Sequence, residues 1–127
     1  MSNIKNAVIR GTTLGYEDHG MLTAWVHVEW DNGGVGFGGN CLDEVVSDAN
    51  GKFLRREGHA YGMEFIARIL KTVGCDTWEK LPGEPVRVSF DHDGLVGGRC
   101  ISLGHYLKEN WFNPKDLAKE FFPDKKE

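Results

Sequence analysis

The sequence predicts an α+β fold: an antiparallel β-sheet of about five to six strands with two main helices packed on one face. Three observations support this class. Residues 21–30 alternate between apolar and polar side chains, as a half-buried strand does. Residues 60–73 instead carry apolar side chains at helical spacing. Segments of these kinds follow one another as strands, helix, strands, helix, and a length of 127 residues allows one domain, which we expect to span residues 1–127.

The first part of the chain contains three predicted strands. Residues 4–13 hold a short apolar block followed by two threonines, and residues 15–20 predict a turn in which glycines enclose two acids and a histidine. In the second strand the side chains that point to one side are those of Leu22, Ala24, Val26, Val28 and Trp30. The sequence Asp-Asn-Gly-Gly at 31–34 predicts a hairpin turn into a third strand at 35–39.

Glycines surround Phe37 in this third strand, and glycine is frequent overall. The chain has 17 glycines, where average usage gives about nine. Glycine inside a strand often marks a bulge, or a place where another backbone or a ligand approaches closely. We therefore expect flat strand surfaces that a partner chain or a nucleotide can approach, with a purely structural bulge as the alternative.

The middle of the chain contains a polar segment and the clearest helix. Residues 43–58 predict a surface loop or a flexible hairpin tip. The helix at 60–73 is expected to end at Gly74, which occupies the C′ position where glycine is favoured. Asp76 as N-cap, with Glu79 three residues later, predicts a capped short helical turn.

The last part of the chain returns to strands and ends in a helix. Residues 86–89 alternate as a strand does, residues 91–94 predict a turn, and residues 95–103 predict the returning strand. Asn113 as N-cap and Pro114 in the first helical position predict the start of the final helix.

Composition and charge exclude several classes of protein. The net charge of −4 argues against binding to long nucleic acid, which needs basic patches, but a small nucleotide needs only two or three well-placed donors. No apolar run is long enough to span a membrane, and the N-terminus lacks the hydrophobic block of a secretion signal. The three cysteines have no metal-binding spacing, so we expect free buried thiols in a reducing cytoplasm.

No catalytic motif is present. The clusters of acids and histidine at 17–19 and 91–93 contain metal-ligand residue types, but neighbouring residues in a turn rarely converge on one ion, so solvated turns are favoured. Neither Cys75 nor Cys100 lies in a nucleophile motif. The glycines at 33–39 lie in a hairpin, whereas a dinucleotide-binding loop joins a strand to a helix. We predict no catalytic residue, no metal site and no cofactor.

The span from 99 to 112 is the main candidate for ligand binding. It combines donors for phosphate, an amide able to read a base edge and aromatic planes able to stack on adenine. The predicted ligand-binding residues are Phe37, Arg99, Ser102, His105, Lys108, Asn110, Trp111 and Phe112. The alternative for Trp111 and Phe112 is a core position ahead of the last helix.

Five stretches of the chain carry a family resemblance. They are N-A-V-I-R-G-T-T-L-G-Y-E-D-H-G (6–20), G-F-G-G (36–39), A-Y-G-M-E-F-I-A-R-I-L-K-T-V-G (60–74), D-T-W-E-K-L-P-G (76–83) and G-H-Y-L-K-E-N-W-F-N-P (104–114). Over these stretches, which cover most of the chain apart from residues 43–58, the sequence resembles the Thoeris anti-defence proteins of the first type.

The resemblance implies a phage-encoded protein that acts in the cytoplasm of the infected bacterial host. Such proteins sequester, without cleaving it, a cyclic ADP-ribose isomer (glycocyclic ADP-ribose, gcADPR) that a TIR-domain protein makes as an alarm signal. The resemblance also implies a homo-dimer or homo-hexamer with the nucleotide between protomers, and in some members a separate site for cyclic di- or trinucleotides. Two alternatives remain open: a protein-binding inhibitor of a bacterial defence complex, as anti-CRISPR proteins are, and a cyclic-nucleotide hydrolase.

Overall fold

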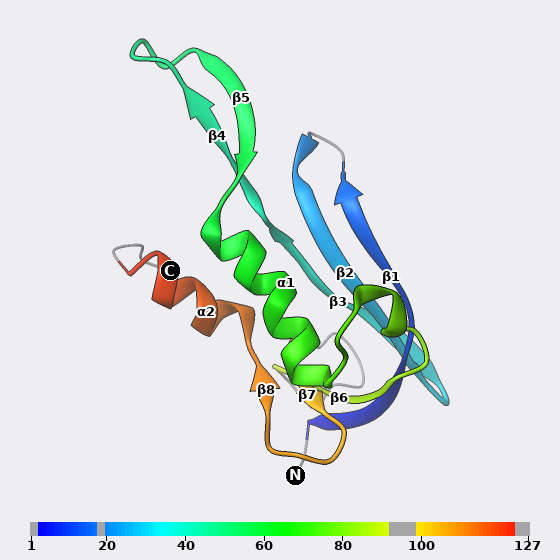
Figure 1. The fold of residues 1–127 in the computed structure, drawn as a ribbon. Helices are drawn as coiled ribbons and strands as arrows, with labels where there is room; N and C mark the ends of the chain where they lie inside the picture. The colour runs from blue at the N-terminus through cyan, green and yellow to red at the C-terminus, as the bar shows by residue number, and fades with distance from the viewer. Residues whose placement is uncertain (1–2, 18–19, 92–98, 124–127) are drawn as a thin grey trace.

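The computed structural model describes residues 3–17, 20–91 and 99–123. Within these residues it confirms the α+β class: a six-stranded antiparallel sheet in the order β3-β2-β1-β6-β7-β8, a separate β4-β5 sheet and two α-helices (Figure 1). The elements are β1 (Ile4–Tyr16), β2 (Leu22–Trp30), β3 (Gly33–Cys41), β4 (Asp43–Ser47), β5 (Phe53–Gly58), α1 (Ala60–Val73), η2 (Trp78–Lys80), β6 (Pro85–Phe90), β7 (Cys100–His105), β8 (Trp111–Phe112) and α2 (Pro114–Phe121).

The large sheet has an inner face against the helices and an outer face that no described helix covers (Figure 1). On β2 the side chains buried on the inner face are those of Ala24, Val26 and Val28, as the alternation predicts. Ile9 of β1 lies directly opposite Val28 and is also buried. Burying such branched apolar side chains is the main favourable contribution to folding.

The helix α1 lies across the inner face of the sheet (Figure 1). Its Phe65 and Ile69 side chains have no exposed surface and belong to the same core cluster as the strands. The helix begins after His59, whose Nδ1 accepts a hydrogen bond from the Gly62 amide at 3.1 Å. It ends as predicted at Gly74, whose φ of 91° is the left-handed conformation that glycine adopts readily.

The shorter helix α2 begins with the predicted residues and packs beside α1. The Asn113 side chain caps it, Pro114 is its first residue, and Leu117 buries its side chain in the core. An ion pair between Arg68 of α1 and Glu120 of α2, 3.5 Å apart, spans the two helices. Among the described residues, no helix is long and apolar enough to cross a membrane.

Strands β4 and β5 form a ribbon that projects from the rest of the molecule, and we call residues 43–58 the arm (Figure 1). The sequence predicted a loop or a hairpin tip here, and the structure has paired strands over most of the segment. At the base of the arm, Arg56 donates from Nε and Nη2 to the Asp43 carboxylate at 3.0 and 2.9 Å. The Leu22 amide of β2 donates to the same carboxylate at 3.3 Å, so Asp43 ties the arm to the large sheet.

Two tryptophans cover glycines of the neighbouring strands. The Trp25 indole of β2 lies over Gly36 and Gly39 of β3, where an added Cβ would come closer than 3.0 Å to the ring. Trp111 of β8 covers Gly104 of β7 in the same way. The strand surfaces at Gly36, Gly39 and Gly104 are therefore covered by indoles of this chain, and the approach of a partner chain or a nucleotide to the other glycines of β3 stays a prediction.

The segment after α1 corrects one predicted cap. Thr77 is the N-cap residue of η2 and makes no side-chain capping bond, whereas the sequence predicted capping by Asp76. The Asp76 side chain is largely exposed and lies 3.8 Å from the Lys80 ammonium group, a partner that competes for its carboxylate. The parts of the predicted turns and returning strand at 18–19 and 92–98 lie outside the described residues.

Candidate ligand-binding cleft

A cleft of about 640 Å³ opens where β3 ends, β7 begins and α2 begins. This volume lies within the range of about 300–1,000 Å³ that is typical of small-molecule sites. The polar side chains on its wall are those of Asn40, Asp91, Arg99, Asn113 and Lys115, and we call it the Arg99 cleft.

The end of β3 forms one wall because its backbone turns at two glycines. Gly38 and Gly39 have φ values of 114° and 79°, which residues other than glycine rarely adopt. An added Cβ at Gly38 would also collide with the carbonyl oxygen of Ala24. The turn directs the chain past the sheet and places Asn40 on the cleft wall.

The opposite wall is the beginning of α2. Asn113 Oδ1 accepts a hydrogen bond from the Lys115 amide at 2.9 Å, which fixes the first turn of the helix. The N-terminal end of a helix carries a partial positive charge and commonly binds phosphate groups. The Lys115 side chain adds a full positive charge at this end.

Residue Arg99 is held at the edge of the cleft by its backbone. Its amide donates to Asp91 Oδ1 at 2.8 Å, and the Asp91 amide donates to the Arg99 carbonyl oxygen at 3.1 Å. These bonds join the end of β6 to the start of β7. The Arg99 residue is exposed, so its guanidinium is available to the solvent and to a bound anion.

The charges on the cleft wall differ in sign from those of the whole chain. Among the wall residues that the structure describes, Arg99 and Lys115 contribute two positive charges and Asp91 contributes one carboxylate, in a protein whose net charge is −4. Cys100 also lines the cleft, and burial raises the pKa of its thiol to about 12. The thiol is therefore neutral at physiological pH, and a neutral thiol is a poor nucleophile. The cleft has the chemistry of an anion-binding site.

The predicted ligand-binding residues do not form one site. Phe37 and Arg99 touch the Arg99 cleft, but the Phe37 side chain is only 1% exposed. Its ring packs against Phe65 and Phe112, with centroids 6.5 and 5.9 Å away. Phe112 is likewise 2% exposed. The structure thus places both rings in the core, which for Phe112 is the alternative that the sequence left open, and ligand binding by either ring stays a prediction.

The side chains of Ser102 and Trp111 line a different and smaller hollow. Its volume is about 270 Å³ and its wall includes the carboxylates of Asp116 and Glu120. The Ser102 hydroxyl is buried and shares a hydrogen bond with Ser89. The Trp111 ring is 4.8 Å from the guanidinium carbon of Arg87. These contacts within the chain account for both side chains.

The last residue of β7, His105, and the connection from β7 to β8 contain the remaining predicted residues. His105 Nδ1 accepts hydrogen bonds from the amides of Leu107 and Lys108, both at 3.0 Å. Asn110 Nδ2 donates to the carbonyl oxygen of Lys71 in α1 at 3.3 Å. The side chains of His105 and Asn110 thus stabilise this connection, and ligand binding by them and by Lys108 stays a prediction.

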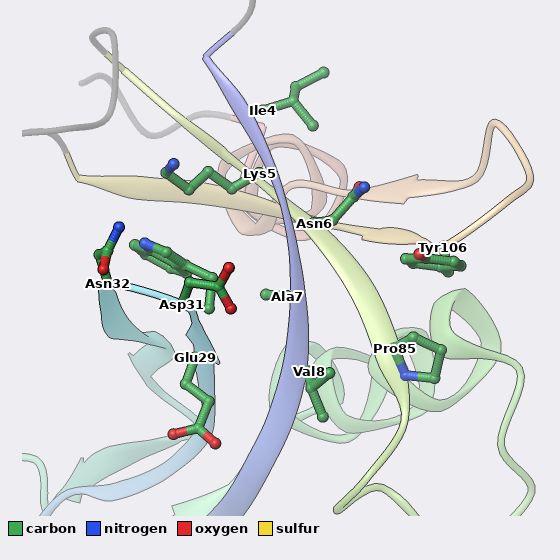
Figure 2. Close-up of a pocket in the computed structure, with 11 residues that line it drawn as sticks. Ile4, Lys5, Asn6, Ala7, Val8, Glu29, Asp31, Asn32, Pro85 and Tyr106 are labelled. Atoms are coloured by element: carbon green, nitrogen blue, oxygen red, sulfur yellow. The ribbon is translucent and has the colours of Figure 1, made fainter.

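A third hollow, of about 540 Å³, lies over β1 on the outer face, flanked by the end of β2 and by Tyr106 (Figure 2). The Lys5 ammonium on its wall is 5.6 Å from the centroid of the Trp30 ring. The carboxylates of Glu29 and Asp31 also line it. With two carboxylates and one ammonium group, this hollow suits a phosphate group less well than the Arg99 cleft does.

Among the residues that the structure describes, no three His, Cys, Asp or Glu side chains are grouped so that they could hold a metal ion. Residues 18–19 and 92–93 of the two acid–histidine clusters lie outside those residues. Of the described members, Glu17 accepts a hydrogen bond from the Trp25 indole nitrogen, and Asp91 accepts from the Arg99 amide. Both carboxylates therefore have structural contacts within this chain.

Sequence reasoning did not include Asn40 and Lys115 among the binding residues. Asn113 and Pro114 predict the start of a helix, and a helix N-terminus is a common anion site. The sequence could therefore have pointed to Lys115 as a binding residue. No pattern in the sequence points to Asn40, because its position depends on how the backbone turns at the glycines of β3.

Searches against protein-family models, curated proteins and solved structures gave no match to this chain.

Proposed function

We propose that this chain binds and sequesters a small cyclic nucleotide signal of the cyclic ADP-ribose class without cleaving it. The observation that carries the proposal is the Arg99 cleft: a nucleotide-sized hollow with Arg99, Lys115 and a helix N-terminus at its wall, in an otherwise acidic chain. Such a protein lowers the free concentration of a signal and thereby blocks Thoeris defence.

The cleft supplies the two kinds of contact that a cyclic ADP-ribose isomer requires. The pyrophosphate of the nucleotide carries two negative charges. The guanidinium of Arg99, the ammonium of Lys115 and the α2 amides can neutralise them. The side-chain amides of Asn40 and Asn113 offer donors and acceptors to base edges and ribose hydroxyls. Sequestration needs no general base or nucleophile, and the neutral Cys100 thiol is consistent with binding alone.

The identity of the signal comes from the sequence resemblance. That resemblance favours gcADPR, and it implies that protomers assemble into a dimer or a hexamer around the nucleotide. A site shared by two chains can supply stacking groups and phosphate donors from both without making either chain basic. Each stacked base contributes about 1–3 kcal/mol, and each 1.4 kcal/mol is about tenfold in affinity.

Titration calorimetry with purified gcADPR tests the proposal. We expect heat of binding for the unchanged protein, and about a tenfold or greater loss of affinity for Arg99→Ala and Lys115→Ala, because each variant removes a charge-assisted phosphate contact. Lys119→Ala is the matched control, since Lys119 is exposed on the same helix and does not line the cleft. No heat with gcADPR, or equal losses in all three variants, would contradict the assignment.

The fate of the ligand separates binding from hydrolysis. After incubation with gcADPR the protein is denatured by heat, and the released nucleotide is analysed by chromatography. We expect intact ligand in an amount equal to the number of occupied sites. A cleaved product would support the cyclic-nucleotide hydrolase. Absence of binding would leave the protein-binding inhibitor as the better explanation.

A further inference from the structure

Two aromatic rings lie on the outer face of β2, where no described helix covers the sheet (Figure 1). Trp25 and His27 alternate along this strand with the buried residues of the inner face, so both side chains point outward. Both are partly exposed, although β2 lies between β1 and β3. Their ring planes are within 10° of each other, and the ring centroids are 6.4 Å apart. We call this pair the aromatic platform.

Glycines of β3 allow both rings of the aromatic platform to lie down on the sheet. A Cβ added at Gly36, the register partner of His27, would be 2.9 Å from the Trp25 ring and 3.7 Å from His27 Nδ1. A Cβ added at Gly39 would collide with the same indole. Parallel rings this close to a strand without side chains turn one face to the strand and the other face outward.

Hydrogen bonds at the edges of the two rings fix their orientation. The Trp25 indole nitrogen donates to Glu17, and His27 Nε2 shares a hydrogen bond with Thr13 Oγ1 at 3.1 Å. On the β1 side, a Cβ added at Gly11 would meet no atom within 4 Å, so there is open space beside the rings. The aromatic platform is therefore pre-organised, and a ligand loses little affinity to ordering it.

The outward face of the indole distinguishes Trp25 from two other tryptophans. The Lys5 ammonium lies 5.6 Å from the ring centroid of Trp30, and the Arg87 guanidinium carbon lies 4.8 Å from that of Trp111. Among the residues that the structure describes, no Lys or Arg side chain lies over the Trp25 ring in this way. This aromatic face therefore remains open for stacking by another molecule.

The charged groups around the aromatic platform favour a neutral ligand. Glu17 lies at the Trp25 end, and Glu29 follows His27 on the same face of β2. The Arg10 guanidinium is 3.8 Å from the Glu29 carboxylate, which offsets its charge. Carboxylates repel phosphate but accept hydrogen bonds from hydroxyl groups. An aromatic cage for a cation needs rings on several sides, whereas two parallel rings form only a floor.

We infer that the aromatic platform binds a neutral saccharide, with sugar rings stacked on the Trp25 indole and the His27 imidazole. A pyranose chair has a flat face of C–H groups and hydroxyls around its edge, which matches apolar rings bordered by Glu17 and Thr13. Two rings in a row fit neighbouring sugars of an extended β-linked glucose chain, whereas an α-linked chain curves away from a flat surface. The described lining of the Arg99 cleft includes neither ring, so this site does not depend on nucleotide binding.

An NMR titration of the full chain with cellohexaose, a β-linked glucose chain, tests the inference. We expect the indole N–H signal of Trp25, assigned by its absence in Trp25→Phe, to shift as cellohexaose is added, while the signal of Trp111 stays in place. Dissociation constants come from the backbone amide shifts. Trp25→Ala is expected to weaken binding by about tenfold or more, because it removes the stacked ring. Trp25→Phe keeps an aromatic face and should retain most of the affinity.

The matched control is Trp111→Ala, because this indole also covers a glycine but carries Arg87 on its ring. Its affinity for cellohexaose should equal that of the unchanged protein. Thr13→Val leaves both rings and the strand in place while it removes the edge hydroxyl, so its expected loss of affinity does not depend on how Trp25→Ala folds. The backbone spectrum establishes that each variant is folded.

Three results would overturn the saccharide site. One is a Trp25 signal that cellohexaose leaves in place. Another is an equal loss of affinity in Trp25→Ala and Trp111→Ala, or equal binding of the α-linked maltohexaose. The third is tighter binding of adenosine than of cellohexaose at Trp25, which would assign the aromatic platform to nucleobases.

Discussion

Replacing Asp43 with asparagine is expected to destabilise the chain by about 1–2 kcal/mol at neutral pH, through the base of the arm. Hydrogen bonding from Arg56 is the main reason that the pKa of Asp43 lies at about 2 instead of 3.8. A difference of this size corresponds to at most about 2.5 kcal/mol in the ionised state. Solvent screens part of this interaction energy, because the Arg56 side chain is 22% exposed. The expected loss of stability is therefore the smaller value of about 1–2 kcal/mol.

The sign of the pH dependence follows from the depressed pKa of Asp43. The contribution is fully present above the unfolded pKa of about 3.8, and it is lost as the pH falls through the folded pKa of about 2. Urea unfolding at pH 7, 5, 4, 3 and 2 measures it as the difference between the unchanged protein and Asp43→Asn. We expect that difference to be about 1–2 kcal/mol at pH 7 and 5 and to shrink between pH 4 and pH 2.

The matched control for this experiment is Glu44→Gln, which neutralises the adjacent, exposed carboxylate on the same strand. It is expected to change stability by less than about 0.5 kcal/mol at any of these pH values. A difference between the unchanged protein and Asp43→Asn that stays constant from pH 5 to pH 2 would refute the electrostatic account.

Two other predictions concern single positions in the sheet. Gly39→Ala is expected to destabilise the chain by about 2–4 kcal/mol in urea unfolding, because its Cβ would collide with the Trp25 indole at a positive φ. Gly51→Ala is the control, because Gly51 has a similar φ of 83° and an added Cβ there meets no other atom within 4 Å. This variant should lose about 1 kcal/mol of stability. Equal losses in the two variants would show that the contact with the indole is unimportant. Cys100 is expected to react with Ellman's reagent at pH 8 only after unfolding, because a pKa of about 12 leaves roughly one thiol in ten thousand ionised. The number of thiols that react in the native protein should therefore be the same in the unchanged chain and in Cys100→Ser. If the native variant has one reactive thiol fewer, the raised pKa of Cys100 is contradicted.

Local patterns predicted much of the fold. The alternation of β2 placed Ala24, Val26 and Val28 on one side of the strand, together with Leu22 and Trp30, and the structure buries the three on that side, because burial on one face imposes a two-residue period. The spacing of apolar residues predicted the helix α1, and Gly74 predicted where it ends. Asn113 and Pro114 gave the start of α2. In each case the sequence pattern that predicts the element lies within a few residues along the chain.

The positions that were missed depend on contacts distant in sequence. The role of the glycines in β3 required the register that places Trp25 above them, and no local pattern contains that register. Phe37 and Phe112 have the residue type of a stacking platform, yet their packing against α1 places them in the core. Arg99, a predicted ligand-binding residue, lines the cleft, and Asn40 lies on the same wall because the distant strand β3 turns there.

The indoles that cover glycines also constrain how this sequence can change. A residue larger than glycine at 36 or 39 needs the space that the Trp25 ring occupies, and Gly104 stands in the same relation to Trp111. Substitutions at these pairs are therefore coupled, and a single exchange passes through a strained intermediate. Related sequences should keep each tryptophan and its glycines together, or replace them together, with a smaller side chain at 25 or 111 accompanying any side chain at the glycine positions.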